Sequence, residues 1–358
     1  MTIASERYLP KWIAWEVTRR CNLNCIHCRS SSCADSVTAE FSTTEAFALI
    51  DAIREVSSPV LVLTGGEPLL RDDLFDIVRY GTEQGLRMCL ATNGTLLSDS
   101  SCVSLRESGI RMVSLSLDGA SKEVHDDFRR CPGAFDGVLR GVETLRRHGI
   151  PFLINSSFTK RNRHDIAATF GLAKSLGATA WYLFMVVPTG RGREILEELI
   201  PASEYEEILR WHWRQERGEE SLLMRPTCAP QYFRVIAQEG GKGTRRRQLA
   251  FATGENRGCL AGQNICLIDA EGGLKPCSYF LSSVGNVRET SFRELWFHSE
   301  TLLELRDLNR LKGKCGVCEY VRVCGGCRAR ADAVFGDYLA EEPFCSYVPS
   351  AFLANHED

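Results

Sequence analysis

Long apolar runs are missing from this sequence. No stretch approaches the roughly 18 consecutive apolar residues that a membrane-spanning helix requires. Three charged residues, Glu6, Arg7 and Lys11, precede the first apolar segment, which does not match the pattern of a secretory signal peptide. We therefore expect a cytoplasmic protein with no membrane partner.

An excess of charge of one sign is also missing. The 43 Lys and Arg residues are nearly balanced by 46 Asp and Glu residues, which leaves a formal net charge of -3. Proteins that bind nucleic acid usually carry a basic surface, so this balance argues against nucleic acid as a partner. An anionic substrate would have to meet a local basic pocket instead.

Cysteine, in contrast, is abundant, with 16 residues in a chain of 358. Because no secretion signal is expected, so many thiols are better explained by metal ligation in a reducing compartment than by disulfide bonds. The chain length and a hydrophobic content of 44% allow one large core and a smaller second unit.

Strand-like apolar segments alternate with helical patterns along the first half of the chain. Strands separated by helices pair in parallel through right-handed crossovers, and six such units can curve into an incomplete barrel. The sequence therefore predicts an α/β fold with a partial (β/α)6 TIM-like barrel over residues 1–200. The predicted strands cover residues 12–17, 60–63, 88–91, 112–117, 152–157 and 181–187.

Polar residues stand where several of these strands end. Sites in α/β folds lie at the carboxyl ends of the strands, although each such residue alone is more often a turn residue. We take Asn93, Ser116, Asp118 and Ser157 as candidate cofactor-binding residues. The full set of polar candidates is Thr64, Asn93, Ser116, Asp118, Asn155, Ser157 and Thr189.

Three cysteines, Cys21, Cys25 and Cys28, lie in one loop after the first predicted strand. A cubane [4Fe–4S] cluster that is held by three thiolates keeps one iron free for another ligand. Closely spaced cysteine and histidine also suit a structural zinc ion, and His27 lies between two of these cysteines. The loop is therefore a candidate catalytic metal site, with a four-iron cluster and zinc as alternatives.

Eight further cysteines crowd the C-terminal region. Two Cys-x2-Cys pairs among them are a strong sign of metal binding, and two zinc ribbons would also use eight thiolates. We interpret residues 259–358 as a cysteine-rich metal-binding extension. Its cysteines are Cys259, Cys266, Cys277, Cys315, Cys318, Cys324, Cys327 and Cys345.

Residues 201–258 are predicted to form a linker or lid, with a helix over 203–217 and an irregular segment over 224–232. The basic run at 245–247 is typical of a solvated face. Cys228 stands alone between two prolines, and a substrate contact, a cluster contact and a structural role all stay open. The remaining cysteines fit no ligand spacing and are predicted to be small buried hydrophobic residues: Cys33, Cys89, Cys102 and Cys131.

The Cys-x3-Cys-x2-Cys loop and the later Gly65-Gly66-Glu67-Pro68 segment together resemble the radical S-adenosylmethionine (SAM) superfamily. The resemblance implies that the free iron of a [4Fe–4S] cluster binds the methionine part of SAM. It also implies that the backbone of Gly65, Gly66 and Glu67 binds the SAM amino group. His27 stands where the superfamily usually has an aromatic residue.

The C-terminal cysteines resemble the SPASM extension of that superfamily, which binds one or two auxiliary [4Fe–4S] clusters. Two residues separate Cys324 from Cys327, where the extension usually has three. The resemblance implies two sets of ligands. The first auxiliary cluster would be held by Cys259, Cys266, Cys277 and Cys327, and the second by Cys315, Cys318, Cys324 and Cys345.

Segments at 13–21, 187–192, 226–230 and 313–330 resemble the heme-biosynthesis group of the superfamily. The implied activity is oxidative decarboxylation of two propionates of iron-coproporphyrin III (Fe-coproporphyrin III) to vinyl groups, which gives heme b. The implied partners are this substrate and a low-potential electron donor of the flavodoxin or ferredoxin type.

Four substrate carboxylates call for arginine side chains, which bind carboxylate through two parallel hydrogen bonds. Candidate substrate residues are Arg191, Arg193, Arg225 and the run at 245–247, with Cys228 beside them. Other classes of function stay open. They are a SPASM enzyme acting on a siroheme-derived tetrapyrrole or on a ribosomal peptide, and an iron–sulfur electron carrier without catalysis.

Overall fold

The computed structural model describes residues 8–36, 38–240 and 257–354. Within these residues the strands form one nine-stranded sheet, in the order β7-β6-β5-β4-β3-β2-β1-β8-β9. All neighbouring pairs are parallel except the hairpin of β8 and β9. The strands are β1 (Trp12–Thr18), β2 (Val60–Gly65), β3 (Arg87–Thr92), β4 (Met112–Ser116), β5 (Phe152–Phe158), β6 (Ala180–Met185), β7 (Leu223–Thr227), β8 (Ile265–Ile268) and β9 (Leu274–Lys275).

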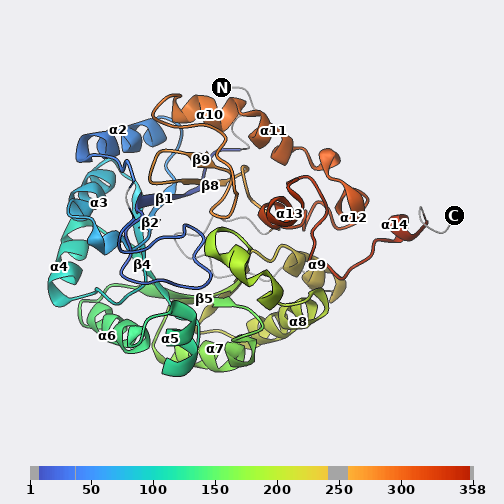
Figure 1. Ribbon diagram of the computed structural model, residues 1–358, viewed down its shortest axis with the longest axis horizontal. Coiled ribbons are helices and arrows are strands. Elements are labelled where there is room, and N and C mark those ends of the chain that lie inside the picture. Colours follow the sequence, from blue (N-terminus) through green and yellow to red (C-terminus); the bar gives the residue numbers. More distant parts are fainter. Residues whose placement is uncertain (1–7, 37, 241–256, 355–358) are drawn as a thin grey trace.

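Helices alternate with the first seven strands and surround the sheet, as Figure 1 shows. These helices are α2 (Thr43–Arg54), α3 (Leu74–Glu83), α4 (Asp99–Ser108), α5 (Lys122–Arg129), α6 (Ala134–Arg147), α7 (Ile166–Ser175), α8 (Ala202–Gly218) and α9 (Gln231–Gln238). The C-terminal region adds α10 (Phe292–His298), α11 (Glu300–Arg306), α12 (Gly313–Gly316), α13 (Arg328–Phe335) and α14 (Ser350–Ala354). Short 3-10 helices are η1 (Pro68–Leu70), η2 (Arg163–Asp165), η3 (Gly190–Glu198) and η4 (Leu308–Arg310).

The two faces of the sheet pack differently because side chains alternate along each strand. Ile13 and Leu61 belong to the main core together with helix residues such as Ile50. Val60 and Val62 belong to a separate cluster that consists of strand residues. The sheet therefore has a helix-covered outer face and an inner face that lines the partial barrel (Figure 1).

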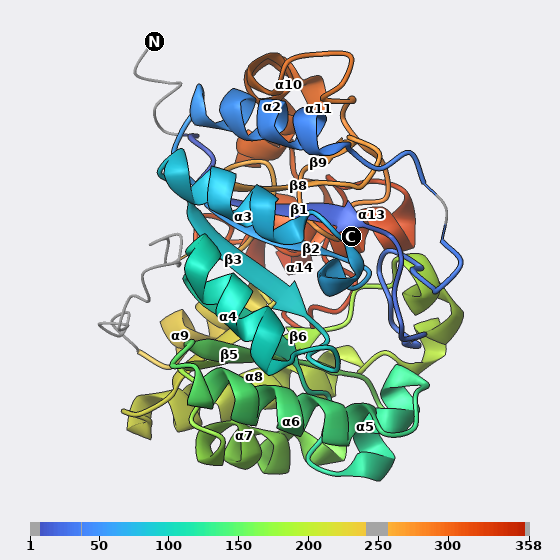
Figure 2. The same cartoon turned by 90° about the vertical axis from the view of Figure 1, so that its left-hand side faces the viewer.

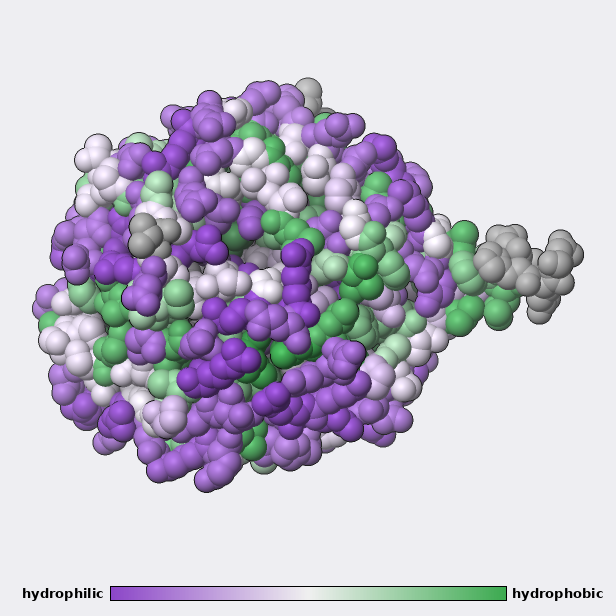
Figure 3. Space-filling model, viewed as in Figure 1, coloured by the Kyte–Doolittle hydropathy of each residue, from purple (hydrophilic) through white to green (hydrophobic). Residues whose placement is uncertain are grey.

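The carboxyl ends of the parallel strands share one side of the molecule. In Figure 2 the arrowhead of β3 and the blue loop after β1 lie toward that same side. Figure 3 shows this face hollowed near its centre. The predicted α/β class and partial barrel are confirmed, and the sheet places the polar strand ends around a common opening.

The structure corrects the prediction that residues 224–232 are irregular. They form most of β7, a seventh parallel strand paired with β6, and the beginning of α9. Pro226 lacks an N–H group, but β7 is an edge strand, where that loss is tolerated. The basic run at 245–247 lies outside the described residues.

The C-terminal region is joined to the barrel sheet rather than separate from it. β8 pairs with β1 from Trp12↔Ile265 to Trp15↔Ile268, and the predicted hairpin to β9 is present. The predicted unit boundaries at residues 200 and 258 stay a prediction. Within the described part of the chain, no helix has both the length and the apolar character needed to cross a membrane.

Candidate active site and iron–sulfur centres

The loop after β1 brings its three predicted cysteines together. Cys21 and Cys25 are 8% and 7% exposed, and Cys28 packs beside them. The backbone N–H of Cys21 donates to the carbonyl of Cys33 at 3.0 Å, and that of Cys28 donates to the carbonyl of Cys25 at 3.3 Å. The three thiols thus line one compact loop at the carboxyl end of the sheet.

A buried guanidinium lies against this loop. Arg129 Nη1 donates to Cys25 Sγ at 3.5 Å, and Arg129 Nη2 pairs with Asp118 Oδ2 at 2.5 Å. Burial raises the pKa of Cys25, while the Arg129 charge opposes that rise. Burial also raises the pKa of Cys21 to about 12. Because metal ligation requires thiolates, the cation beside Cys25 favours the ligating form.

Asp118, predicted to contact a cofactor, is fully buried and engaged with protein groups. Its Oδ1 accepts from the backbone N–H of Ser157 at 2.7 Å, and its Oδ2 pairs with Arg129. Asp118 therefore holds Arg129 near Cys25. A cofactor contact for Asp118 and for Ser157 stays a prediction.

The backbone of the glycine loop after β2 packs directly against the backbone of the cysteine loop. A Cβ atom on Gly65 would lie 2.1 Å from the Thr18 carbonyl oxygen, and one on Gly66 would lie 2.1 Å from the Arg20 carbonyl oxygen. The backbone N–H groups of Gly66 and Glu67 donate to these same two oxygens at 2.8 Å. Glycine is therefore required for this close approach.

Glu67 is buried beneath the same loop and organises the next strand end. Its carboxylate accepts from Thr92 Oγ1 at 2.7 Å, from the Asn93 N–H at 2.8 Å and from the Leu69 N–H at 3.1 Å. Burial raises the pKa of Glu67 to about 7, and these hydrogen bonds oppose the rise. Asn93 Nδ2 in turn donates to Asn22 Oδ1 in the cysteine loop at 2.8 Å.

The inner face becomes polar toward the carboxyl ends of the strands. Ser116, Asn155, Tyr182 and Arg225 form a row across β4, β5, β6 and β7, because each is paired in register with the next. We call these four residues the inner polar row. It places two predicted polar residues, Ser116 and Asn155, in one row with the predicted substrate residue Arg225.

Arg191 lies against the cysteine loop. Its Nε donates to the Cys25 carbonyl at 2.8 Å, and its Nη1 donates to the Ser32 carbonyl at 2.9 Å. These bonds clamp the cysteine loop and occupy donors that a substrate carboxylate would need. Arg193 is exposed. Burial raises the pKa of Asp332, and the charge of Arg193 opposes this rise. Substrate contacts by both arginines stay predictions.

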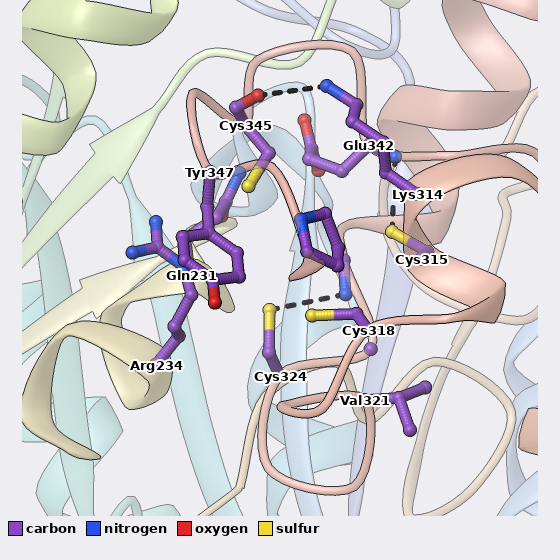
Figure 4. Close-up of a pocket in the computed structure, with 13 residues that line it drawn as sticks. Gln231, Arg234, Lys314, Cys315, Cys318, Val321, Cys324, Glu342, Cys345 and Tyr347 are labelled. Carbon is purple, nitrogen blue, oxygen red and sulfur yellow. Dashed lines mark hydrogen bonds between the residues drawn. The ribbon is translucent and has the colours of Figure 1, made fainter. Parts of the chain in front are cut away.

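Four C-terminal cysteines line one cavity. Figure 4 shows Cys315, Cys318, Cys324 and Cys345 with their sulfur atoms around a common space. Arg234 also lines it, and the Arg234 charge opposes the rise that burial causes in the pKa of Cys345. These four cysteines, which we call the second group, match the ligand set predicted for the second auxiliary cluster.

The other predicted set is only partly brought together. The Cys259 N–H donates to the Cys324 carbonyl at 3.1 Å, which places Cys259 beside the turn that leads to Cys327. After burial, the charges of Cys259 and Cys327 raise the pKa of Cys277. We call Cys259, Cys277 and Cys327 the first group. Cys266, predicted to belong with them, lies in β8 within the main core.

Three residues between these centres were not predicted. Glu342 Oε2 accepts from the Cys327 N–H at 2.7 Å, while the Glu342 N–H donates to Cys315 Sγ at 3.4 Å. Arg330 pairs with Glu342. Burial, followed by the charge of Cys228, raises the pKa of Tyr279, while the charge of Arg29 opposes the rise. The spacing of cysteines along the sequence indicates which residues bind a metal, but it does not indicate which other side chains contact them.

Two leftover cysteines behave as predicted and two do not. Cys89 and Cys102 are 4% and 0% exposed. Cys33 and Cys131 are only partly buried, and Cys131 packs against the cysteine loop. Within the described ranges, no three histidine, cysteine, aspartate or glutamate side chains converge on one single-ion position.

Comparison with known proteins gives these thiols a context. A model of the radical SAM superfamily matches residues 15–173, and a model of the SPASM iron-sulfur cluster-binding domain matches residues 259–328. A protein from Methanosarcina barkeri named AdoMet-dependent heme synthase is 48% identical over 342 residues, which cover 95% of this chain and 97% of that one. The chain belongs to the radical SAM superfamily.

Other relatives agree with this family, and solved structures share the fold. An AdoMet-dependent heme synthase from Oleidesulfovibrio alaskensis is 43% identical, covering 94% of this chain and 87% of its own. A Methanosarcina barkeri Fe-coproporphyrin III synthase is 32% identical, covering 93% and 87%. The fold resembles SuiB of Streptococcus suis bound to S-adenosylmethionine, with TM-score 0.74, 15% identity and coverage of 95% and 78%. It also resembles anSMEcpe with bound AdoMet and a peptide, with TM-score 0.68, 20% identity and coverage of 94% of each chain.

As a radical SAM enzyme with a SPASM domain, the chain uses SAM, a [4Fe–4S] cluster and auxiliary iron–sulfur clusters. The thiol groups fit these cofactors, because each is shielded from solvent and has a cation near it. Arg129 serves the loop after β1, Arg330 the first group and Arg234 the second group.

Proposed function

We propose that this enzyme is a heme synthase that oxidatively decarboxylates two propionates of Fe-coproporphyrin III to vinyl groups, which gives heme b. The observation that carries the proposal is the near-full-length identity of 48% and 43% to two proteins named AdoMet-dependent heme synthase. A more distant relative carries the name of the proposed substrate, Fe-coproporphyrin III synthase.

The reaction needs a hydrogen atom and an electron to leave each propionate. One-electron cleavage of SAM supplies a 5′-deoxyadenosyl radical, which is the chemistry that the cluster contributes. Hydrogen abstraction by that radical leaves a carbon radical on the propionate. Loss of carbon dioxide and formation of the vinyl group then require one electron to depart.

The chain's own residues divide this work between two regions. Cys21, Cys25 and Cys28 would hold the SAM-cleaving cluster, with SAM against the backbone of Gly65, Gly66 and Glu67. The C-terminal groups would receive the departing electron, and Tyr279 lies within electrostatic range of both Arg29 and Cys277. These positions support a short path from the cysteine loop to the first group.

Substrate binding would use the inner polar row and the hollowed face shown in Figure 3. Arg225 would offer a guanidinium to a propionate, with Tyr182 beside it in register and Asn155 one strand further along the same row. We place Arg193 at the rim, because it is exposed on η3. A flavodoxin or ferredoxin would supply the first electron, and a reducing cytoplasm would keep the thiols available for ligation.

The test is anaerobic turnover with Fe-coproporphyrin III, SAM and a reductant, followed by mass spectrometry. We expect each propionate to lose one carbon dioxide and two hydrogens, with 5′-deoxyadenosine formed alongside. A siroheme-derived tetrapyrrole should be left unchanged in a parallel reaction. Conversion of that compound, with Fe-coproporphyrin III untouched, would make the siroheme-derived alternative the better assignment.

A further inference from the structure

The first group contains three cysteines, but a [4Fe–4S] cluster held entirely by protein thiolates needs four. Cys266 is the fourth member by resemblance, and Cys228 is the other cysteine near this part of the chain. The positions of these two thiols differ clearly. The choice between Cys228 and Cys266 as the fourth ligand rests on the proposed function in one respect only: the first group is taken to hold an iron–sulfur cluster.

Cys266 lies on the wrong face of the sheet. It is paired in parallel register with Ile13, so the two side chains share the helix-covered outer face. Cys266 is 1% exposed. Burial raises the pKa of Cys266, and the charge that opposes this rise, among the described residues, is that of Arg306. Its position in β8 is that of a core residue.

Cys228 lies among the first group. It follows the last residue of β7, and its thiol is within electrostatic range of the thiols of Cys327, Cys277 and Cys259. β7 and β9 are the two edges of the open sheet, and Cys277 comes just after β9. The group therefore draws one cysteine from beyond each edge of the partial barrel.

The backbone at Cys228 is held in position by buried groups. Its carbonyl accepts from Tyr205 Oη at 2.8 Å and from Arg330 Nη2 at 2.7 Å. Its φ of 56° is in the left-handed region, which few residues other than glycine, asparagine and aspartate adopt. A β-strand would otherwise continue past Thr227, and this turn redirects the chain at the cysteine.

We propose that Cys228, rather than Cys266, is the fourth protein ligand of the first auxiliary cluster, together with Cys259, Cys277 and Cys327. In this arrangement the cluster links the two edges of the open sheet. Tyr205 and Arg330 act as positioning residues, because their hydrogen bonds fix the carbonyl of Cys228.

The experiment counts iron and sulfide in the full-length chain after anaerobic reconstitution. It uses a background variant in which Cys21, Cys25 and Cys28 are all alanine, so that the auxiliary clusters are read alone. We expect about eight irons per chain in this background. Adding Cys228→Ser should lower the count to about four, or leave a cluster that mild oxidation converts to the three-iron form seen by electron paramagnetic resonance.

Two further variants separate ligation from structure. Cys228→Gly permits the positive φ without a thiol, so it should reproduce the loss seen for Cys228→Ser. Cys266→Ala is the matched control and should keep the background's iron content and spectrum. The proposal is overturned if Cys228→Ser keeps the full count and resists oxidation, or if Cys266→Ala alone loses the cluster. A background count of about four that stays at four when Cys228→Ser is added would overturn it too, since the first group would then hold no cluster.

These readouts do not involve heme formation. A failure of turnover with Fe-coproporphyrin III would count against the proposed function and would leave the iron counts unaffected. Conversely, a full iron count in Cys228→Ser would refute Cys228 as a cluster ligand and would leave the proposed decarboxylation activity unaffected.

Discussion

Arg330 and Glu342 form a buried ion pair, with 3.0 Å between Nη1 and Oε1 and with each side chain 1% exposed. Around it the two C-terminal cysteine groups meet. The Glu342 carboxylate accepts from the Cys327 N–H, and the Glu342 N–H reaches Cys315 Sγ. The pair therefore sets the position of both groups at once.

Breaking this pair should destabilise the C-terminal region strongly. Arg330→Met or Glu342→Gln alone leaves an uncompensated buried group, which costs about 3–5 kcal/mol of unfolding free energy. The double variant should lose less than the sum of the two. Anaerobic urea unfolding measures this, with Arg79→Ala as the control, because the Arg79–Asp76 pair is exposed and contributes less than about 1 kcal/mol. Strict additivity would show that the pair does not act as a unit.

Alanine at Cys21, Cys25 or Cys28 should abolish 5′-deoxyadenosine formation, because these thiolates hold the iron that would bind SAM. The auxiliary iron content should remain at about eight per chain. Liquid chromatography of the nucleoside product checks the first result. Cys102→Ala, in the core of α4, is the matched cysteine control and should cleave SAM normally. SAM cleavage retained in any loop variant would refute the assignment.

Alanine at Cys315 or Cys318 should separate SAM cleavage from product formation. The second group would be a closed four-thiolate set, so it has no free iron for SAM and serves to remove electrons. We expect continued 5′-deoxyadenosine formation with little or no heme. Both products can be measured in one reaction. An unchanged heme yield would mean that these cysteines have a structural role. The electron released by the substrate would then leave by another route.

Arg129→Met should lower the reduction potential of the cluster at the cysteine loop. The guanidinium donates to Cys25 Sγ and favours the more negative, reduced cluster. The variant also leaves Asp118 unpaired, so Arg129→Met/Asp118→Asn should recover stability without recovering the potential. A redox titration followed by electron paramagnetic resonance gives the potential. A value equal to that of the unmodified protein would mean that this hydrogen bond does not tune the cluster.

Gly66→Ala should displace the cysteine loop, because the new Cβ would lie 2.1 Å from the Arg20 carbonyl oxygen. Overpacking of this kind costs roughly 1–3 kcal/mol of stability. If this strain must be relieved for SAM to bind, it corresponds to about a 5- to 160-fold loss of SAM affinity. Gly171→Ala is the matched control, since its Cβ would meet nothing within 4 Å in α7. Equilibrium SAM binding compares the two variants. Equal affinities would show that the glycine loop does not govern the SAM site.

The sequence alone located the cysteine loop as a metal site and determined the α/β class. Both depend on local patterns: three thiols within eight residues of the chain, and apolar strands alternating with amphipathic helices. The ligand set predicted for the second group came from the resemblance to the SPASM extension, because proximity in sequence alone would have favoured Cys327 over Cys345. Pro226 and Pro230 concealed β7, since local rules cannot tell that a strand will lie at a sheet edge.

Only the tertiary structure decided which distant residues serve these thiols. Arg191 reaches the Cys25 carbonyl across 166 positions, and Arg129 reaches Cys25 Sγ across 104. Cys228 lies within electrostatic range of Cys259 and Cys277, although it follows β7 at one edge of the sheet and Cys277 follows β9 at the other. Such neighbours have no signature in spacing, because strand order and barrel curvature, rather than separation along the chain, place them side by side.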